Sequence, residues 1–438
     1  MRCPECGRDV EDGTRVCPWC GAYADAPAVQ TERRRGGRTA AVAVVALVVI
    51  VVAACLIMYS GDGGSDDTEP DTPSVFTTAS TGSGSKSVEY TVSYTSEYKD
   101  LFTVENGTNE NGSAFIKVTM ADSEAEKYDS FVWYVYKNDS HGNKLQNSVT
   151  KSEATATWTL GDDSFGKYTF GVICSESDWL DSNLPFRWTP WDQTEYTVSF
   201  DIGGTITETY SWKHGGSDLS ATATYGYDEY SKYAGTNGAS LVTRSGNGTG
   251  EYSLVPGFIV VDDTVKELES SLRAQYALTG GVPEGQGYAE FILAFVQECF
   301  GYVLDIQQYS QEEYYAFPIE TIYNGGGDCE DTSILCAALF EAAGYEAGVF
   351  LIPGHAIAAV SIDTYEAGAV SEEYAAKVAV FSMQSDGKTF YGCETTLDTD
   401  SYGVGYVSTD YSVVDNAIYY KGEPAGGSYG LYRAGATA

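Results

Sequence analysis

Residues 325–344 read GGGDCEDTSILCAALFEAAG, which predicts a buried helix that begins at a cysteine. Asp328 is a favourable N-cap after three glycines, and Gly344 is a typical helix stop. Between them, apolar side chains recur at helical spacing, at Ile334, Leu335, Ala338, Leu339 and Ala342. This places Cys329 in the first turn, where free backbone N–H groups and the positive end of the helix dipole favour a thiolate.

A histidine follows at the start of an apolar run. His355 comes after Pro353 and Gly354 and opens the run HAIAAV, a pattern that predicts a strand. The other two histidines, His141 and His214, lie in polar segments. A cysteine at a helix start and a histidine that opens a nearby strand form the nucleophile and base of cysteine acyl-transfer enzymes.

The composition is strongly acidic and excludes nucleic acid as a partner. The chain of 438 residues carries 25 basic and 62 acidic side chains, a formal charge of −37. Residues 1–39 hold seven Arg and six acidic residues, a net charge of +1, so the remainder carries −38. Such a surface repels nucleic acid and anionic lipid. The 34 Tyr and 48 Gly favour a β-rich protein on the cell exterior.

Residues 40–59 are 20 consecutive residues without a charge, AAVAVVALVVIVVAACLIMY. A helix of this length matches the bilayer core, which is about 30 Å thick. A buried core helix is a poor alternative, because the segment has no polar face. The flanking arginines predict a cytoplasmic N-terminus and extracellular C-terminal domains, as in a single-pass protein of the cell membrane; they are Arg33, Arg34, Arg35 and Arg38.

Two C-x2-C pairs near the N-terminus predict a structural zinc site. The ligands are Cys3, Cys6, Cys17 and Cys20. Two pairs at this spacing suit tetrahedral Zn²⁺, although a pair of redox dithiols is the alternative. Residues 1–22 are similar to the short zinc ribbon of many archaeal and bacterial membrane proteins, which offers a surface for a cytoplasmic protein partner. Residues 23–39 are expected to form a cytoplasmic tether, and residues 60–87 a disordered stalk.

Alternating apolar and polar residues predict a β-sandwich of immunoglobulin-like kind over residues 88–192. The expected strands are 88–94, 114–120, 131–136, 154–160 and 168–174. Cys174 stands alone, so the usual Cys–Trp–Cys pattern is missing. We expect this domain to act as a spacer. Its sequons fit an extracellular location, at Asn106, Asn111, Asn138 and, beyond the domain, Asn247.

A second domain is expected over residues 193–438, with a strand-rich first part. Asp263 is expected to cap a helix whose apolar face carries Val265, Leu268 and Leu272. The segment TGGVPEGQG ends that helix, and a second helix is expected over residues 288–300.

Five short segments of this domain resemble archaeal and bacterial transglutaminase-like cysteine peptidases. They are FVQ (295–297), Tyr302 with Asp305, EYYAFPIET (313–321), GGDCED (326–331) and PGH (353–355). The resemblance covers residues 263–405. It implies an α+β fold with a papain-like core, in which the cysteine-bearing helix packs on an antiparallel sheet that supplies the histidine and an acid.

The resemblance assigns the acid to Glu394, in the segment FYGCETT (390–396), where the family commonly has Asp or Asn. Antiparallel pairing supports this position, because a returning strand ends opposite the start of its neighbour. Asp363 follows His355 by eight residues, roughly 26 Å along a strand, which is too far. Asp398 is an alternative. Gln297 is implied as an oxyanion donor beside the Cys329 backbone N–H, or it is an ordinary helix-surface glutamine.

Together, Cys329, His355 and Glu394 predict a membrane-anchored, extracellular cysteine peptidase or amidase that needs no catalytic cofactor and acts on protein or peptide substrates. Transamidation and a non-catalytic surface module stay open as alternatives. Acidic residues beside Cys329 are expected to be cap and first-turn residues, although their charge opposes a thiolate unless they point away. A disulfide from Cys329 to Cys336 or Cys393 would disable the site.

Overall fold

The computed structural model describes residues 74–79, 84–139, 142–151, 153–161, 164–175, 193–241, 254–370, 372, 374–396, 403–426 and 428–435. The predicted zinc ribbon, tether and membrane-spanning segment (residues 1–59) lie outside these ranges. Within them, no helix has the length and apolar character that crossing a bilayer requires. The fold is mixed α and β, with more strand than helix.

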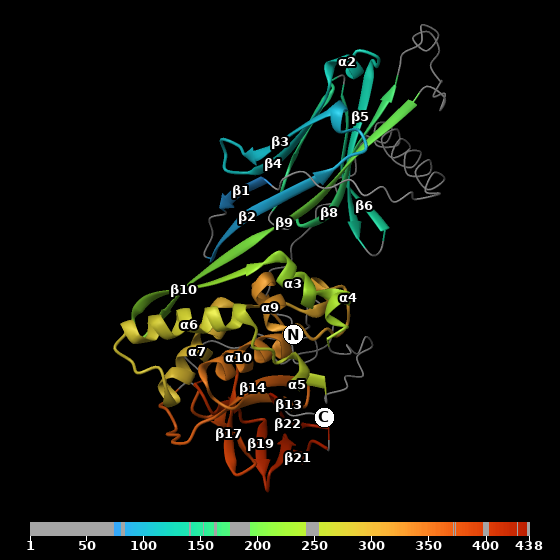
Figure 1. Cartoon of the computed structure of the whole chain (residues 1–438). Helices are drawn as coiled ribbons and strands as arrows, with labels where there is room; N and C mark the ends of the chain where they lie inside the picture. The colour runs from blue at the N-terminus through green and yellow to red at the C-terminus, as the bar shows by residue number, and fades with distance from the viewer. Residues whose placement is uncertain are drawn as a thin grey trace, which may run out of the picture. The chain divides into compact units, whose positions relative to one another are not determined.

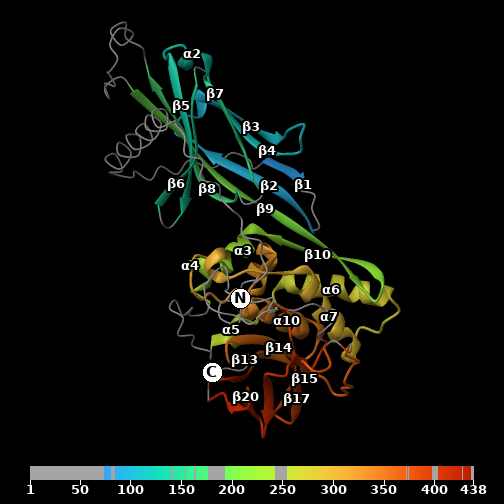
Figure 2. The ribbon, with the colours of Figure 1, turned by 180° about the vertical axis from the view of Figure 1, so that it is seen from behind.

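The first part of the described chain consists of two antiparallel sheets (Figures 1 and 2). The larger sheet has the order β1 (Ser74–Ala79), β2 (Gly84–Thr95), β9 (Gln193–His214), β8 (Gly166–Ser175), β5 (Ser130–Asp139) and β6 (Gly142–Lys151). The smaller sheet is β3 (Phe102–Thr108), β4 (Ala114–Met120) and β7 (Thr155–Thr159). Short helical turns accompany them, η1 (Lys99–Leu101) and α2 (Asp122–Ala125).

Residues alternate between the two faces of these strands. In β4, Ala114, Ile116, Val118 and Met120 are buried, and the residues between them are only partly covered. Val88, Tyr90 and Val92 repeat this period in β2, so both sheets contribute to one apolar core. The strands expected over residues 88–174 are all present.

The stalk predicted over residues 60–87 is wrong in part. Residues 74–79 form β1, which pairs with residues 87–92 of β2, and β2 already begins at Gly84. The segment 74–79 reads SVFTTA, which is rich in residues that favour strands. The antiparallel ladder satisfies its backbone groups, so the polar composition around it does not keep this segment unpaired.

Strand β9 links the sandwich to the second part of the chain. Residues 193–202 pair with β8, and residues 199–210 pair with β2. The far end forms a hairpin with β10 (Ser217–Gly226), which contacts α6 (Asp263–Leu278) (Figure 1). Strand β9 therefore contacts both parts of the chain, and it begins at Gln193, the first residue of the predicted second domain.

The second part packs helices on a five-stranded antiparallel sheet. The strand order is β16 (Ser382–Ser385), β17 (Lys388–Cys393), β14 (His355–Ser361), β13 (Ala347–Ile352) and β22 (Gly430–Arg433). The other helices are α3 (Tyr227–Tyr233), α4 (Gly235–Gly238), α5 (Val255–Phe258), α7 (Gly285–Cys299), α8 (Asp305–Gln308), α9 (Pro318–Asn324) and α10 (Cys329–Ala343). Helix α10 lies against β13 and β14 (Figure 1).

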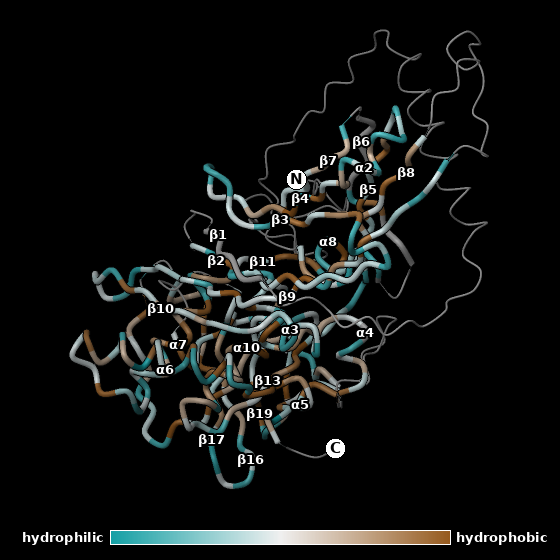
Figure 3. Tube along the Cα trace, turned by 45° about the horizontal axis from the view of Figure 1, so that its top comes forward, coloured by the Kyte–Doolittle hydropathy of each residue, from teal (hydrophilic) through white to brown (hydrophobic). Residues whose placement is uncertain are grey.

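Short strands complete the second part. They are β11 (Gly301–Tyr302) with β12 (Gly326–Gly327), β15 (Val378–Val380) with β18 (Tyr406–Ser408), and the sheet β19 (Tyr411–Val414), β20 (Ala417–Tyr420) and β21 (Glu423–Pro424). Apolar residues gather in α7, α10 and β13, whereas the turn that follows β16 is hydrophilic (Figure 3). The sheet and α10 therefore form the interior on which the site is built.

Helix α10 begins at Cys329 and ends at Ala343, with Gly344 left-handed at φ 95°, as predicted. The predicted side-chain cap is wrong, because the Asp328 side chain makes no capping hydrogen bond. Instead, the Thr332 hydroxyl donates to the Asp328 backbone carbonyl at 2.8 Å. The α6 cap lies one residue earlier than predicted, since the Asp262 carboxylate accepts the Val265 N–H at 2.9 Å.

Candidate active site

Cys329 is the first residue of α10 and is partly buried. Its sulfur faces the backbone N–H of Ala356, the residue that follows His355 at the start of β14. The helix start and the strand start therefore meet at the sulfur. This contact places Cys329 beside the start of the strand that carries His355, although the two residues are 26 positions apart in the sequence.

His355 is hydrogen-bonded to Glu394. Its Nε2 lies 2.8 Å from Glu394 Oε2. The side chain of His355 is 19% exposed and that of Glu394 is 5% exposed, so the pair is shielded from water. Because Nε2 is engaged by the carboxylate, Nδ1 is the nitrogen left to exchange a proton with a neighbouring group.

Strand register explains how Glu394 reaches His355. Strands β14 and β17 are antiparallel, with Ala358 opposite Cys393 and Ala359 opposite Gly392. Glu394 directly follows the last residue of β17 and so lies beside the beginning of β14. Asp363 is exposed and comes after the end of β14. Asp398 lies outside the described residues.

Several hydrogen bonds hold Glu394 in place. Its Oε1 accepts the Thr396 backbone N–H at 3.1 Å and the Thr396 hydroxyl at 2.7 Å. Its backbone carbonyl accepts the Gln297 side-chain amide from α7 at 2.7 Å. Gln297 is therefore not an ordinary surface glutamine, because one of its N–H groups fixes the residue that contacts His355.

The pKa values of His355 and Glu394 are shifted toward each other's charged partner. Burial lowers the pKa of His355, but Glu394, with a smaller contribution from Glu330, raises it above the ordinary value overall. Burial raises the pKa of Glu394, yet His355 and Thr396 lower it to below its ordinary value. Neutral His355 is thus a stronger base than a buried imidazole without a carboxylate partner would be.

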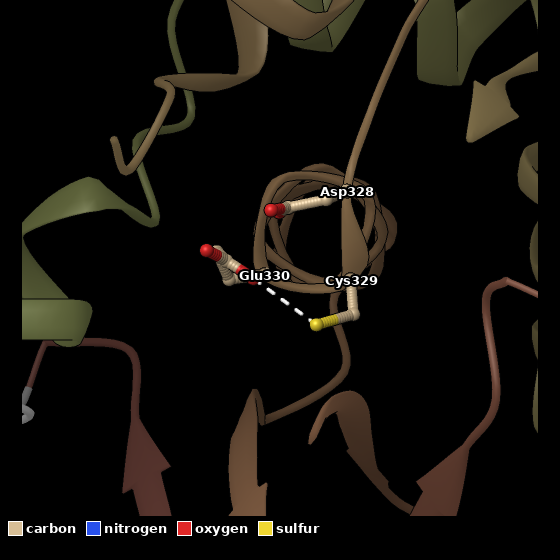
Figure 4. A group of neighbouring side chains, drawn as sticks. All are labelled: Asp328, Cys329 and Glu330. Carbon is tan, nitrogen blue, oxygen red and sulfur yellow. Dashed lines mark hydrogen bonds between the residues drawn. The ribbon is translucent and has the colours of Figure 1, made fainter. Parts of the chain in front are cut away.

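The Cys329 thiol is held in its protonated form. Burial, then Glu330 and Asp328, raise the pKa of the thiol well above its ordinary value, and the Ala356 N–H opposes this increase. The sulfur donates to Glu330 Oε2 at 3.1 Å. Figure 4 shows the sulfur turned toward Glu330, with the Asp328 carboxylate on the same side of the helix start. The acidic neighbours do not all point away from Cys329.

Further residues from distant segments surround the start of α10. Burial raises the pKa of both Tyr302 and Tyr411, and charge at Cys329 is among the further causes for each, which locates the two phenols near the sulfur. Thr395 bonds the Thr332 hydroxyl at 2.9 Å and so ties the turn after β17 to α10. Tyr302 and Thr395 lie in segments that the family resemblance includes, whereas nothing in the sequence points to Tyr411.

All cysteines of the described residues are free, namely Cys174, Cys299, Cys329, Cys336 and Cys393. No disulfide in this part of the chain therefore blocks the sulfur of Cys329. Cys336 and Cys393 are fully buried, as small apolar side chains are. The predicted zinc ligands are outside the described ranges.

Comparison with known proteins adds little. No known protein family and no curated protein matches this sequence. A solved structure described as a candidate protease from Parabacteroides distasonis is 8% identical, with a TM-score of 0.19, over 76% of this chain and 70% of that chain. A TM-score this low carries no information about a shared fold.

Proposed function

We propose that this chain is a cysteine peptidase or amidase that cleaves amide bonds through Cys329, His355 and Glu394. The observation that supports it most directly is the orientation of His355. Its Nε2 is bonded to a buried carboxylate, and the Cys329 sulfur lies at the neighbouring Ala356 N–H. A nucleophile at a helix start and a base fixed by a third group are what acyl transfer by cysteine requires.

In the proposed reaction, His355 Nδ1 accepts the proton of the Cys329 thiol. The thiolate attacks the carbonyl carbon of the substrate amide, and Glu394 stabilises the imidazolium that has formed. The imidazolium then donates its proton to the departing amine, which leaves an acyl-thioester on Cys329. Water, deprotonated by His355, attacks the thioester and releases the acid and the free thiol.

Two donors are proposed for the oxyanion of the tetrahedral intermediate. The first is the Cys329 backbone N–H, which is free of helical bonding because Cys329 is the first residue of α10. The second is the N–H of Gln297 that does not contact the Glu394 carbonyl. Glu330 must release the thiol when a substrate binds, because its hydrogen bond keeps the sulfur protonated.

The remaining parts of the proposal come from the sequence. Residues 40–59 anchor the chain in the cell membrane, the arginines before them keep the N-terminus in the cytoplasm, and the catalytic part acts on protein or peptide substrates outside. Cys3, Cys6, Cys17 and Cys20 bind a structural Zn²⁺ on the cytoplasmic side, where a protein partner can dock.

Alkylation of Cys329 tests the catalytic proposal. The full chain in detergent is treated with iodoacetamide at neutral pH, and peptide mapping gives the rate at each cysteine. We expect His355→Ala to slow the alkylation of Cys329 by at least tenfold, because the base that accepts the thiol proton is lost. The buried Cys336 is the internal control and should stay unmodified in both proteins.

Turnover is measured next, with fluorescein-labelled casein and a fluorescent primary amine. Hydrolysis that disappears in Cys329→Ala supports a peptidase, whereas incorporation of the amine into casein indicates transamidation. If Cys329 reacts at the same slow rate with and without His355 and no substrate turns over, the enzyme proposal is wrong and a binding module remains.

A further inference from the structure

The segment after the family resemblance reaches the active site through Tyr411. The resemblance ends at residue 405, and Tyr411 is the first residue of β19. Its hydroxyl donates a hydrogen bond of 3.0 Å to the backbone carbonyl of Pro353. Pro353 and Gly354 directly precede His355. This bond therefore joins the C-terminal part of the chain to the segment that carries the proposed base.

The turn between β13 and β14 consists of Pro353 and Gly354 alone. The flanking residues, Ile352 and His355, pair with each other. The ring of Pro353 holds its φ at about −65°, and Gly354 has φ 71°. A negative φ followed by a positive one defines a type II turn, whereas two-residue hairpins favour the mirror-image types, because types I and II splay the flanking strands. The turn thus adopts a conformation that the hairpin alone does not favour.

The Tyr411 hydroxyl opposes rotation of the central peptide of this turn. The Pro353 carbonyl belongs to the peptide that changes direction between type I and type II, so a hydrogen bond to its oxygen selects one of the two types. Burial, then Tyr420 and Glu394, raise the pKa of the Tyr411 phenol above its ordinary value. The hydroxyl therefore keeps its proton and stays a donor.

Tyr411 is itself held by the hairpin of β19 and β20. It pairs with Tyr420 across the two strands, and the ring centroids are 5.1 Å apart. Ile418 of β20 is buried in an apolar cluster with Ile352 of β13 and Ile357 of β14, and Tyr411 packs against this cluster. The donor is thus fixed relative to both strands that flank the turn.

The orientation of the turn affects two contacts of the active site. His355 directly follows the turn, and its Nε2 lies 2.8 Å from Glu394 Oε2. The next backbone N–H, that of Ala356, faces the Cys329 sulfur. Charge at Glu394 and at Cys329 contributes to the raised pKa of Tyr411, which locates its phenol near both groups. Rotation of the peptide before His355 would displace the two contacts together.

We propose that Tyr411 is a positioning residue of the active site. Its hydroxyl holds the turn of residues 353–354 in the type II conformation, which directs His355 toward Glu394. This role rests on the proposed function, in which His355 is the base. Tyr411 acts through the turn and not on the substrate, so the segment after residue 405 is needed for a reactive Cys329.

Tyr411→Phe tests the role, because it removes the hydroxyl and keeps the ring. The full chain in detergent is treated with iodoacetamide from mildly acidic to mildly alkaline pH, and peptide mapping gives the rate at Cys329. We expect the rate at neutral pH to fall by about three- to tenfold, the factor that loss of one hydrogen bond gives in a conformational equilibrium. Tyr420→Phe, which removes the hydroxyl of the neighbouring ring, should react as wild type does.

The titration of His355 measures its positioning without reference to catalysis. The chain is labelled with ¹³C-histidine and followed by NMR against pH, and the signal of His355 is assigned by its absence in His355→Ala. The pKa of His355 should be lower in Tyr411→Phe than in wild type, because fewer molecules keep the contact with Glu394 that raises it. A tyrosine that only stabilises the fold would leave this titration unchanged.

Gly354→Ala tests the same turn from within. An added Cβ would meet no atom within 4 Å, but φ 71° is a conformation that alanine rarely adopts, so the substitution disfavours the type II turn. It should slow the alkylation of Cys329 as Tyr411→Phe does. The double variant should react no more slowly than Gly354→Ala alone, because both changes act on one peptide.

One pair of results would overturn the positioning role. It is wrong if Tyr411→Phe equals wild type in both the alkylation rate of Cys329 and the titration of His355, even where His355→Ala slows alkylation and so supports the enzyme. The reverse outcome is separate from this one. A lowered His355 pKa in Tyr411→Phe supports the positioning role even if Cys329 reacts equally with and without His355, a result that contradicts the proposed enzyme alone.

Discussion

Glu394 contacts His355 although its side chain is one methylene longer than the Asp that the sequence resemblance leads us to expect. The additional methylene is accommodated because both ends of the residue are fixed. Thr396 donates two hydrogen bonds to the carboxylate, and Gln297 donates one to the backbone carbonyl. At the scale of single residues, a well-anchored glutamate therefore orients a histidine as a shorter acid would.

Replacing Glu394 by Gln should lower the pKa of His355. Burial alone lowers it, and the Glu394 carboxylate reverses this effect in the wild type. Histidine labelled with ¹³C and followed by NMR against pH measures the change. An unchanged His355 curve would mean that the two side chains do not interact in solution.

The same pair should affect stability in a defined pH window. The pKa of His355 is raised, so its stabilisation is complete below about pH 6.5 and is lost as the pH rises through the folded-state value. The pKa of Glu394 is lowered, so its contribution is present above about pH 4.3 and is lost as the pH falls through its folded-state value. In Glu394→Gln, urea unfolding should lose both dependences.

Glu330→Gln should make Cys329 more reactive. Glu330 accepts the thiol hydrogen bond and is, after burial, the largest cause that raises the thiol pKa. Removing one adjacent charge should raise the alkylation rate at neutral pH by roughly tenfold, the effect of one pKa unit. Glu312→Gln removes an exposed acid and serves as the control. A rate that stays at the wild-type value would show that Glu330 does not control the thiol.

The features of the site that depend on near neighbours in the sequence were predictable. The contacts that depend on rotamers or on distant segments were not. Cys329 at a helix start and Gly344 at its end follow from spacing and backbone preference, which depend on near neighbours. The hydrogen bond from Cys329 to Glu330 does not follow from spacing, because it depends on the rotamer of each side chain. Asp305 lies 23 residues before Asp328, so only the fold shows that both reach the start of α10.

At the scale of elements, the C-terminal end of α10 depends on a single glycine. Its C-cap, Gly344, has φ 95°, a conformation that L side chains rarely adopt, and the position is open to solvent. Gly344→Ala should therefore cost about 1–2 kcal/mol of unfolding free energy through backbone strain alone. Urea unfolding followed by tryptophan fluorescence measures this difference.

The control for Gly344→Ala is Gly368→Ala. A Cβ atom at residue 368 would also meet no other atom within 4 Å, but the φ of Gly368 is not positive. Gly368→Ala should unfold within about 0.5 kcal/mol of wild type, as surface substitutions usually do. Equal effects of the two changes would mean that helix α10 does not depend on its left-handed cap.

At the scale of the whole described chain, β9 is a strand of the large sheet of the sandwich and also packs on helix α7 of the second part. It is 22 residues long and pairs with β2, β8 and β10. Alternation of apolar and polar residues predicts a strand, but it does not show that one strand packs on two parts of the chain. A strand that contacts two cores keeps the same period of two residues in both. Partial unfolding of one part would expose the apolar face that β9 presents to the other.

We therefore expect the sandwich and the cysteine-bearing part to unfold together. Trp212 on β9 packs against Phe291 and Phe295 of α7, with ring centroids 5.7 and 5.1 Å away. Trp212→Ala should cost about 3–5 kcal/mol. Its effect should extend to the sandwich, where Cys174 is buried in β8, as well as to Cys336 in α10.

Alkylation of these two thiols across a urea series measures unfolding in each part of the same molecule. In wild type, Cys174 and Cys336 should become reactive at one urea concentration, and Trp212→Ala should shift both midpoints down by the same amount. Trp158→Ala, in the sandwich core, is the matched control and should also move both thiols together. If Trp212→Ala exposes Cys336 while Cys174 stays protected, β9 does not couple the two parts, because the strand then holds its place in the sandwich after the helices have separated from it.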